Sequence, residues 1–366
     1  MSIRTLRHVL RFRLLATCFI TYSLFFLNIT PCLANRPIAT NRDNYIDFLR
    51  SLGLLLLVVA HTAAPKAIEA LRTFDVPLMV FVSALCYRPL VGGYFIYARK
   101  RFIRIYKPVF IFLTIIFLAI IICNSLYGKP EIKWPQIIGS YLLLNQPSIG
   151  YIWIMRVFII IALAIPFLYK YSQRQSWLAI CLSTAIIIVI QHYVILLINL
   201  IYLETVRFVL SEIIPYLLGY SAIALPALKI KRINTRQMSI TLFALILSLL
   251  IFFFLYGIES PQLYKYPPQS LYILYGLFCS IGLWKIKPAV IRLIPISNRA
   301  IRYLSQNSMW IYLWHIIPVY VVDYFSNIFA SWPLRYIFVL TTALICTELY
   351  NKISSQFSIA FLRFWN

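Results

Sequence analysis

The chain has 366 residues, of which 62% are hydrophobic and 12% are charged, and its formal net charge is +24. Soluble domains contain about 45–50% apolar and about 25% charged residues. This composition, with a mean hydropathy of +0.83, therefore excludes an ordinary soluble protein, a disordered tail and a fibrous repeat. The basic residues lie between apolar blocks, where they act as topology signals beside anionic membrane lipids. They do not indicate nucleic-acid binding.

The seven cysteines all lie in apolar stretches and form no C-x-x-C pair. A disulfide framework or a zinc site normally needs closely spaced or paired cysteines. We therefore expect buried thiols that behave as small hydrophobic side chains, and no metal site.

Residues 1–40 form an N-terminal extension of uncertain role. Four arginines precede the apolar run Leu14–Leu33, and the small-residue stretch 31–34 follows, a pattern typical of a signal peptide. Cleavage there would place the new N-terminus outside and invert every later loop. We therefore treat the extension as signal-like or interfacial and place no function in it.

Residues 41–352 predict one all-α, polytopic integral membrane domain with about ten transmembrane helices, followed by a short cytoplasmic tail at 353–366. A helix needs about 20 apolar residues to cross the hydrocarbon layer. The predicted spans are 45–63, 74–91, 108–127, 149–169, 177–201, 207–226, 239–257, 270–286, 308–323 and 334–350.

The distribution of lysine and arginine supports this count. If the segment before the first span is cytoplasmic, nineteen basic residues fall in inner segments and seven fall in outer loops. Positively charged loops stay on the cytoplasmic side. We therefore expect a bacterial inner-membrane protein with both termini in the cytoplasm.

Arginines gather at the predicted inner ends of the first and third spans. Arg50 lies in the first span, and Arg99, Arg101 and Arg104 precede the apolar part of the third. Topology statistics alone explain most of that run. The planar guanidinium also matches phosphate oxygens well. An intracellular cofactor with several phosphates is therefore a reasonable ligand.

Ionisable residues in the outer half of the membrane are costly and mark candidate sites. They are His61, Asp75, Arg156, His192, Glu212 and Asp323, with His315 at mid-depth. A short hairpin would bring His61 and Asp75 together as an acid–base dyad, because a carboxylate can orient an imidazole. The alternative is that Asp75 only caps its own helix.

Arg50 and His61 lie eleven residues apart in one predicted span. On a continuous helix this separation is about 16.5 Å. The arrangement suits a long, thin cofactor that enters from the cytoplasm and presents its reactive end deeper in the membrane. Acyl-coenzyme A has that shape.

The same residues resemble the acyltransferase 3 family of membrane acyltransferases. The stretch Arg42–Arg50 followed by His61 is similar to the family's opening, and Arg72–Ser83 is similar to its second-helix signature. Further matches are Arg99-Lys-Arg101, Arg104–Pro108, Tyr151–Arg156, Tyr264–Pro268 and Ser308–His315. Ser83-Ala84 departs from the family's usual Ser-Gly.

The resemblance implies transfer of an acyl group, usually acetyl, from coenzyme A to a hydroxyl of a surface glycan such as O-antigen, lipooligosaccharide or capsule. It implies that His61 is the base or transient acyl carrier, with Arg50, Arg99 and Arg101 at the donor acetyl-CoA. The partnership of Asp75 with His61 is our own inference from topology.

The acceptor is expected at the outer face. There Arg156 is a candidate for stabilising an oxyanion, Glu212 is a candidate contact, and Tyr264, Lys265 and Tyr266 are candidates for binding acidic sugars. An interfacial aromatic belt is the plainer interpretation of the tyrosines. A glycan transporter or flippase is the main alternative function, because buried charges and proline-broken helices are common in transporters. A structural scaffold is a third alternative.

Overall fold

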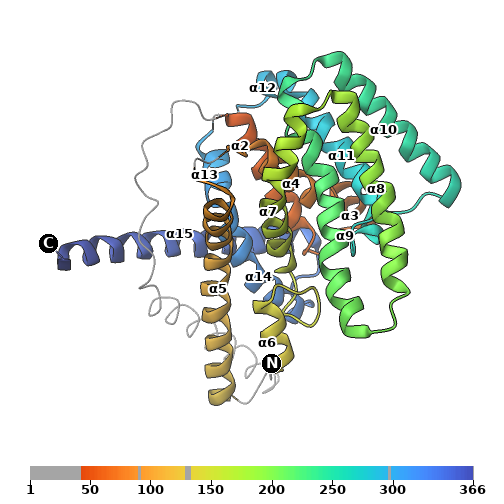
Figure 1. Cartoon of the computed structure of the whole chain (residues 1–366). Coiled ribbons are helices and arrows are strands. Elements are labelled where there is room, and N and C mark those ends of the chain that lie inside the picture. Colours follow the sequence, from red (N-terminus) through yellow and green to blue (C-terminus); the bar gives the residue numbers. More distant parts are fainter. Residues whose placement is uncertain (1–42, 90–91, 128–132, 296–297, 366) are drawn as a thin grey trace.

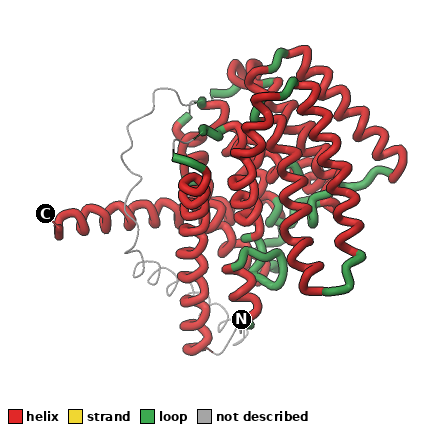
Figure 2. The backbone as a smooth tube through the Cα atoms, in the orientation of Figure 1, coloured by secondary structure: helices red, strands yellow, loops and turns green. Residues whose placement is uncertain are grey.

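The computed structural model describes residues 43–89, 92–127, 133–295 and 298–365. The expected N-terminal extension lies outside the described residues. The elements are α2 (Asn44–Val59), α3 (Lys66–Arg72), α4 (Asp75–Leu85), α5 (Tyr94–Tyr127), α6 (Trp134–Tyr141), α7 (Trp153–Arg174), α8 (Trp177–Asn199), α9 (Glu204–Ala227), η1 (Ile230–Arg232), α10 (Thr235–Tyr256), η2 (Pro261–Tyr264), α11 (Ser270–Lys285), α12 (Lys287–Leu293), α13 (Arg299–Gln306), α14 (Ser308–Tyr324) and α15 (Trp332–Trp365). The described residues contain helices and loops without a strand (Figure 2), which confirms the all-α prediction.

Each of the ten predicted spans falls on a helix, but fewer helices are long enough to cross a bilayer. Among the described residues six helices have the required length and apolar composition, or up to seven if the bent pair α11–α12 is one span. The count of ten is therefore not confirmed. The reason is length, since α2, α4 and α14 have only 16, 11 and 17 residues.

The short helices occupy the centre of the molecule. Figure 1 shows α5 on one side and α8 and α10 on the other, with α2, α4 and α7 between them. Nine of the eleven residues of α4 are buried, whereas Leu249 is the one buried residue of α10. A helix that is apolar on every side belongs either in a protein core or against lipid. Accordingly α4 forms the core, and α10 presents its apolar surface to the membrane.

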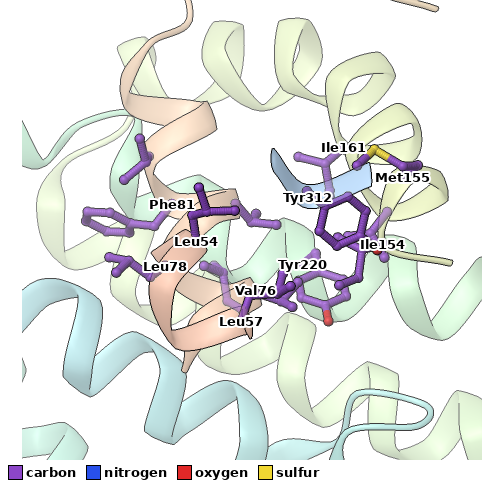
Figure 3. Close-up of a cluster of buried hydrophobic side chains, with 14 of the residues drawn as sticks. Leu54, Leu57, Val76, Leu78, Phe81, Ile154, Met155, Ile161, Tyr220 and Tyr312 are labelled. Atoms are coloured by element: carbon purple, nitrogen blue, oxygen red, sulfur yellow. The ribbon is translucent and has the colours of Figure 1, made fainter. Parts of the chain in front are cut away.

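Tight packing around α4 fixes the central helices. Figure 3 shows Leu54 and Leu57 of α2 with Leu78 and Phe81 of α4 in one buried cluster. A Cβ atom at Gly276 of α11 would lie 2.5 Å from the Cβ atom of Pro77, so only glycine permits this approach of α11 to α4.

The N-terminus of α2 is anchored on the side of the molecule away from His61. The carboxylate of Asp43 caps α2 by accepting a hydrogen bond from the backbone N–H of Tyr45 and pairs with Lys287 at 2.8 Å. The hydroxyl of Ser51 donates to the carbonyl oxygen of Ile301, which fastens α2 to α13. These contacts hold α2 at its first turn and at Ser51, next to Arg50.

Candidate active site

His61 follows the last residue of α2 by two positions and lies between two other segments. Its ring makes an edge contact with Tyr151, at 4.4 Å between centroids, and lies 5.4 Å from the ring of His315. Tyr151 belongs to the loop before α7, and His315 lies on α14. Three segments that are far apart in the sequence therefore meet at His61.

His315 is completely buried, and one of its nitrogens is fixed by its own helix. Its Nδ1 atom is hydrogen-bonded to the carbonyl oxygen of Tyr312. Because a carbonyl only accepts, Nδ1 carries the proton and Nε2 presents a lone pair. That Nε2 atom has no hydrogen-bond partner, and neither does the buried hydroxyl of Tyr312.

Asp75 is the first residue of α4 and pairs with two cationic side chains. Its Oδ2 atom lies 2.9 Å from Nη1 of Arg72, and its Oδ1 atom lies 3.4 Å from Nζ of Lys265. All three side chains are buried, with exposed fractions of 0% for Asp75 and 3% for each cation. Arg72 and Lys265 also interact electrostatically with His61.

The predicted direct partnership of Asp75 and His61 has no supporting contact. In the described part of the chain, the hydrogen bonds of the Asp75 carboxylate go to Arg72, Lys265 and the backbone of Val76. Asp75 thus holds two cations near His61 instead of touching its ring. A catalytic role for Asp75 stays a prediction.

The loop that carries Lys265 is fastened to α3. The side-chain oxygen of Gln262 accepts hydrogen bonds from Nη2 of Arg72 at 3.4 Å and from the hydroxyl of Thr73 at 3.5 Å. Burial lowers the pKa of the Lys265 ammonium, whereas the Asp75 carboxylate opposes that shift. The faces of Trp153 and Tyr266 lie 5.9 and 5.7 Å from Nζ and also favour its charged form.

A second ion pair joins Arg156 of α7 to Glu212 of α9. Glu212 also accepts a hydrogen bond from the backbone N–H of Asn145 at 3.2 Å, and Arg156 lies over the ring of Tyr216 at 4.9 Å. The Nε and Nη2 atoms of Arg156 have no partner. Rings link this pair to Lys265, because Trp153 contacts both Tyr216 and Tyr266. Among the candidates for acceptor binding, Tyr264 differs, because its hydroxyl donates to Glu259.

Arg50 is the seventh residue of α2 and precedes His61 by eleven residues. Its Nη1 atom donates to the hydroxyl of Ser305 at 3.3 Å, and its Nη2 atom lies 3.3 Å from the sulfur of Cys86. Ser305 in turn donates to Asp47 at 2.7 Å. The five N–H donors of a guanidinium leave Arg50 able to bind a further anion.

The arginines of α5 are not brought into contact with Arg50. Arg101 lies over the ring of Tyr97 at 5.5 Å, and Arg99 and Arg104 are exposed. Their assignment to a phosphate-bearing ligand stays a prediction, supported by exposure and charge alone.

Several other sequence candidates lie at the periphery. His192 is exposed, and the half-exposed Asp323 pairs with Arg335 at 3.9 Å. No group of three histidine, cysteine or acidic side chains among the described residues is placed to hold a metal ion. The half-buried Cys86, Cys181, Cys279 and Cys346 are free thiols.

Sequence reasoning missed Arg72, Tyr151 and Ser305 as members of this arrangement and left His315 without a role. Arg72 precedes Asp75 by only three residues, so this pair was detectable from the sequence, although Arg72 ends α3 and Asp75 begins α4. Tyr151, Ser305 and His315 reach their partners only through the tertiary fold.

The comparisons with known proteins agree with the resemblance. The Acyl_transf_3 family model, described as an acyltransferase domain, matches residues 43–350. No significant match was found among curated proteins or among solved structures. The family match covers most of the chain and includes every residue of the site above.

Proposed function

The chain belongs to the acyltransferase 3 family and is a membrane acyltransferase, and on this premise we propose that it is an O-acetyltransferase of the bacterial inner membrane. It transfers acetyl from acetyl-CoA to a hydroxyl of a surface polysaccharide: O-antigen, lipooligosaccharide or capsule. The observation that carries this proposal is the position of His61, held against Tyr151 and His315 and eleven residues from Arg50.

The donor supplies a thioester whose carbonyl carbon accepts a nucleophile. Arg50 contacts the donor phosphates in this proposal, together with Arg99, Arg101 and Arg104 at the cytoplasmic side. Each terminal nitrogen of Arg50 carries a second N–H besides the one directed at Ser305 or Cys86, and these donors support that role, because phosphate oxygens bind arginine well. Nine residues of α2, about 13.5 Å of helix, and the turn that follows Val59 separate Arg50 from His61, a length that an extended arm can cross.

His61 acts as the general base in the direct route. It takes the proton of the sugar hydroxyl while the new C–O bond forms and the C–S bond breaks, and it then gives that proton to the departing sulfur. In the covalent route, His61 first carries the acetyl group on its imidazole and then passes it to the hydroxyl. Both routes need an unprotonated nitrogen on His61.

His315 supports the base in either route. Its Nε2 lone pair is buried, unpartnered and adjacent to His61. An N–H···N hydrogen bond of about 3 Å between two imidazoles places their centroids about 5 Å apart, close to the separation here. Catalytic hydrogen bonds often tighten only when substrate binds. We therefore assign His315 to fixing the tautomer of His61.

The acceptor binds near Arg156, Glu212, Lys265 and Tyr266, where aromatic faces and unpartnered donors occur together. Tyr264 is the weakest member of this proposal, because its hydroxyl already binds Glu259. The excess of lysine and arginine on one set of loops supports an orientation in which this cluster faces away from the cytoplasm and both termini lie in the cytoplasm.

Proton NMR of surface polysaccharide tests the proposal. Cells with the gene should show acetyl ester signals that mild base removes, and cells without it should lack them. Complementation with the His61→Ala variant should leave the signals absent at normal protein level. Intact acetylation with His61→Ala contradicts the assignment, and blocked polymer export with acetylation retained would instead indicate a flippase.

A further inference from the structure

Two buried cations share a single carboxylate beside His61. Arg72 and Lys265 both pair with Asp75, and neither makes another ion pair among the described residues. Each of the three side chains is at most 3% exposed. The cluster therefore holds one positive charge in excess at a place that water barely reaches.

An excess buried charge is costly unless an anion or several hydrogen bonds compensate it. The Nε atom of Arg72 is buried and has no hydrogen-bond partner in the part of the chain that the structure describes. The ammonium of Lys265 has three donors, and its one side-chain hydrogen bond goes to Asp75. Unused donors on both cations therefore accompany the excess charge.

In the described ranges, Asp75 is the one carboxylate that pairs with either cation. Glu212 is engaged with Arg156, and Glu259 accepts the hydroxyl of Tyr264. The other described contacts of the two cations are neutral: Gln262 accepts a hydrogen bond from Arg72, and the rings of Trp153 and Tyr266 lie beside Lys265. Aromatic faces beside a charged group are typical of a sugar-binding surface with a fixed ionic contact.

We propose that the acceptor of this enzyme carries an anionic oxygen group, a carboxylate or a phosphate, which binds to Arg72 and Lys265 and thereby places a hydroxyl of the same acceptor at His61. This inference rests on the proposed function and adds the substrate class. Lys265 lies over the ring of Trp153, and Tyr151, two residues before Trp153, contacts the ring of His61. An anion held by the two cations therefore lies close enough to His61 to position a neighbouring hydroxyl.

The bound anion also assists the chemistry. His61 becomes positively charged when it takes the hydroxyl proton, close to Arg72 and Lys265. The negative charge of the acceptor offsets the excess charge at that moment. A neutral sugar leaves the excess charge in place and loses the ionic contact, so the site discriminates against it.

Three acceptors that differ in charge at one carbon test this inference: methyl glucoside, methyl glucuronide and methyl glucoside 6-phosphate. The purified full chain in lipid nanodiscs is supplied with acetyl-CoA, and release of the free coenzyme A thiol is measured with each sugar. We expect kcat/KM for one charged sugar to exceed that for the neutral sugar by about ten- to hundredfold, the range of a charge-assisted contact. The carboxylate and phosphate arms show which anion is preferred.

The variant Lys265→Met should reduce this charged-to-neutral ratio towards one, and Lys265→Arg should restore most of it. The ratio does not depend on the fraction of folded protein. The control Lys66→Met removes an exposed lysine of α3 and should leave the ratio unchanged. Equal use of neutral and charged sugars, or a ratio unchanged in Lys265→Met, overturns the inference while leaving acetyl transfer itself intact.

A binding measurement decides the case in which none of the three sugars is acetylated. Thermal stabilisation of the nanodisc-embedded protein by methyl glucuronide or by the phosphate sugar, absent with methyl glucoside and absent in Lys265→Met, supports the anion site. Equal shifts with all three sugars, or no shift with any, overturn it. Failure of the proposed function is distinct, since acetyl-CoA would then not be consumed with any acceptor, cellular polysaccharide included.

Discussion

At the scale of single residues, the site consists of an imidazole surrounded by groups that are fixed by other parts of the fold. His315 is oriented by the carbonyl of Tyr312, and Asp75 is committed to Arg72 and Lys265. His61 itself makes only ring contacts through its side chain in the described structure. A base with uncommitted nitrogens is available to a substrate, and its committed neighbours keep the surroundings in place.

Replacing His315 tests whether this residue orients His61 or only supports the fold. His315→Ala removes the acceptor that orients His61, so kcat should fall by about 10²-fold or more, the scale of general base catalysis, while KM for acetyl-CoA stays unchanged. His315→Gln keeps a donor and an acceptor in the side chain and should recover part of kcat. Steady-state kinetics of purified protein provide the measurement. Equal losses in both variants together with a raised KM would indicate a purely structural role.

At the scale of elements, the active site depends on a short, largely buried α4 with α2 and α11 packed against it. Gly276 allows α11 to approach Pro77 of α4, and the loop before α11 carries Lys265. A shift of α11 away from α4 therefore also moves Lys265 away from Asp75. The packing of these two helices and the geometry of the site are coupled.

Two glycines on α11 provide a matched test of that coupling. Gly276→Ala places a Cβ atom 2.5 Å from Pro77, and overpacking of this kind costs about 1–3 kcal/mol. We expect a lower thermal transition temperature and reduced transfer activity. Gly282→Ala meets nothing closer than 4.0 Å and should leave both quantities unchanged or slightly raised. Equal effects in the two variants would show that the α4–α11 contact is unimportant.

At the scale of the whole molecule, apolar runs predicted where helices occur but not how many cross the membrane. The central helices α2, α4 and α14 are shorter than a bilayer-spanning helix, and other helices surround them. A hydropathy pattern does not reveal this difference. The same limit applies to the site. The carboxylate of Asp75 binds Lys265, 190 residues later, and Arg50 binds Ser305, 255 residues later. Candidate site residues were recognisable by their side-chain type and their predicted depth in the membrane. Their partners depend on tertiary packing.

Membrane orientation follows from the basic loops. The excess of lysine and arginine on one set of loops predicts that the end of α15 faces the cytoplasm. A reporter active only in the cytoplasm, fused after residue 366, should therefore be active. A periplasmic reporter at the same junction should be silent. The reverse result would place Arg50 outside and remove the route by which acetyl-CoA reaches it.

In the proposed function Arg50 of α2 holds the donor phosphates and His61, in the turn that follows α2, is the reacting group. Release of coenzyme A thiol by purified protein over a range of acetyl-CoA concentrations tests it most directly. Arg50→Ala should raise KM for acetyl-CoA about tenfold or more with a smaller change in kcat, whereas His61→Ala should abolish kcat. Arg236→Ala, an exposed arginine of α10, should match the wild type. The account is contradicted if Arg50→Ala leaves the acetyl-CoA dependence unchanged or if His61→Ala remains active.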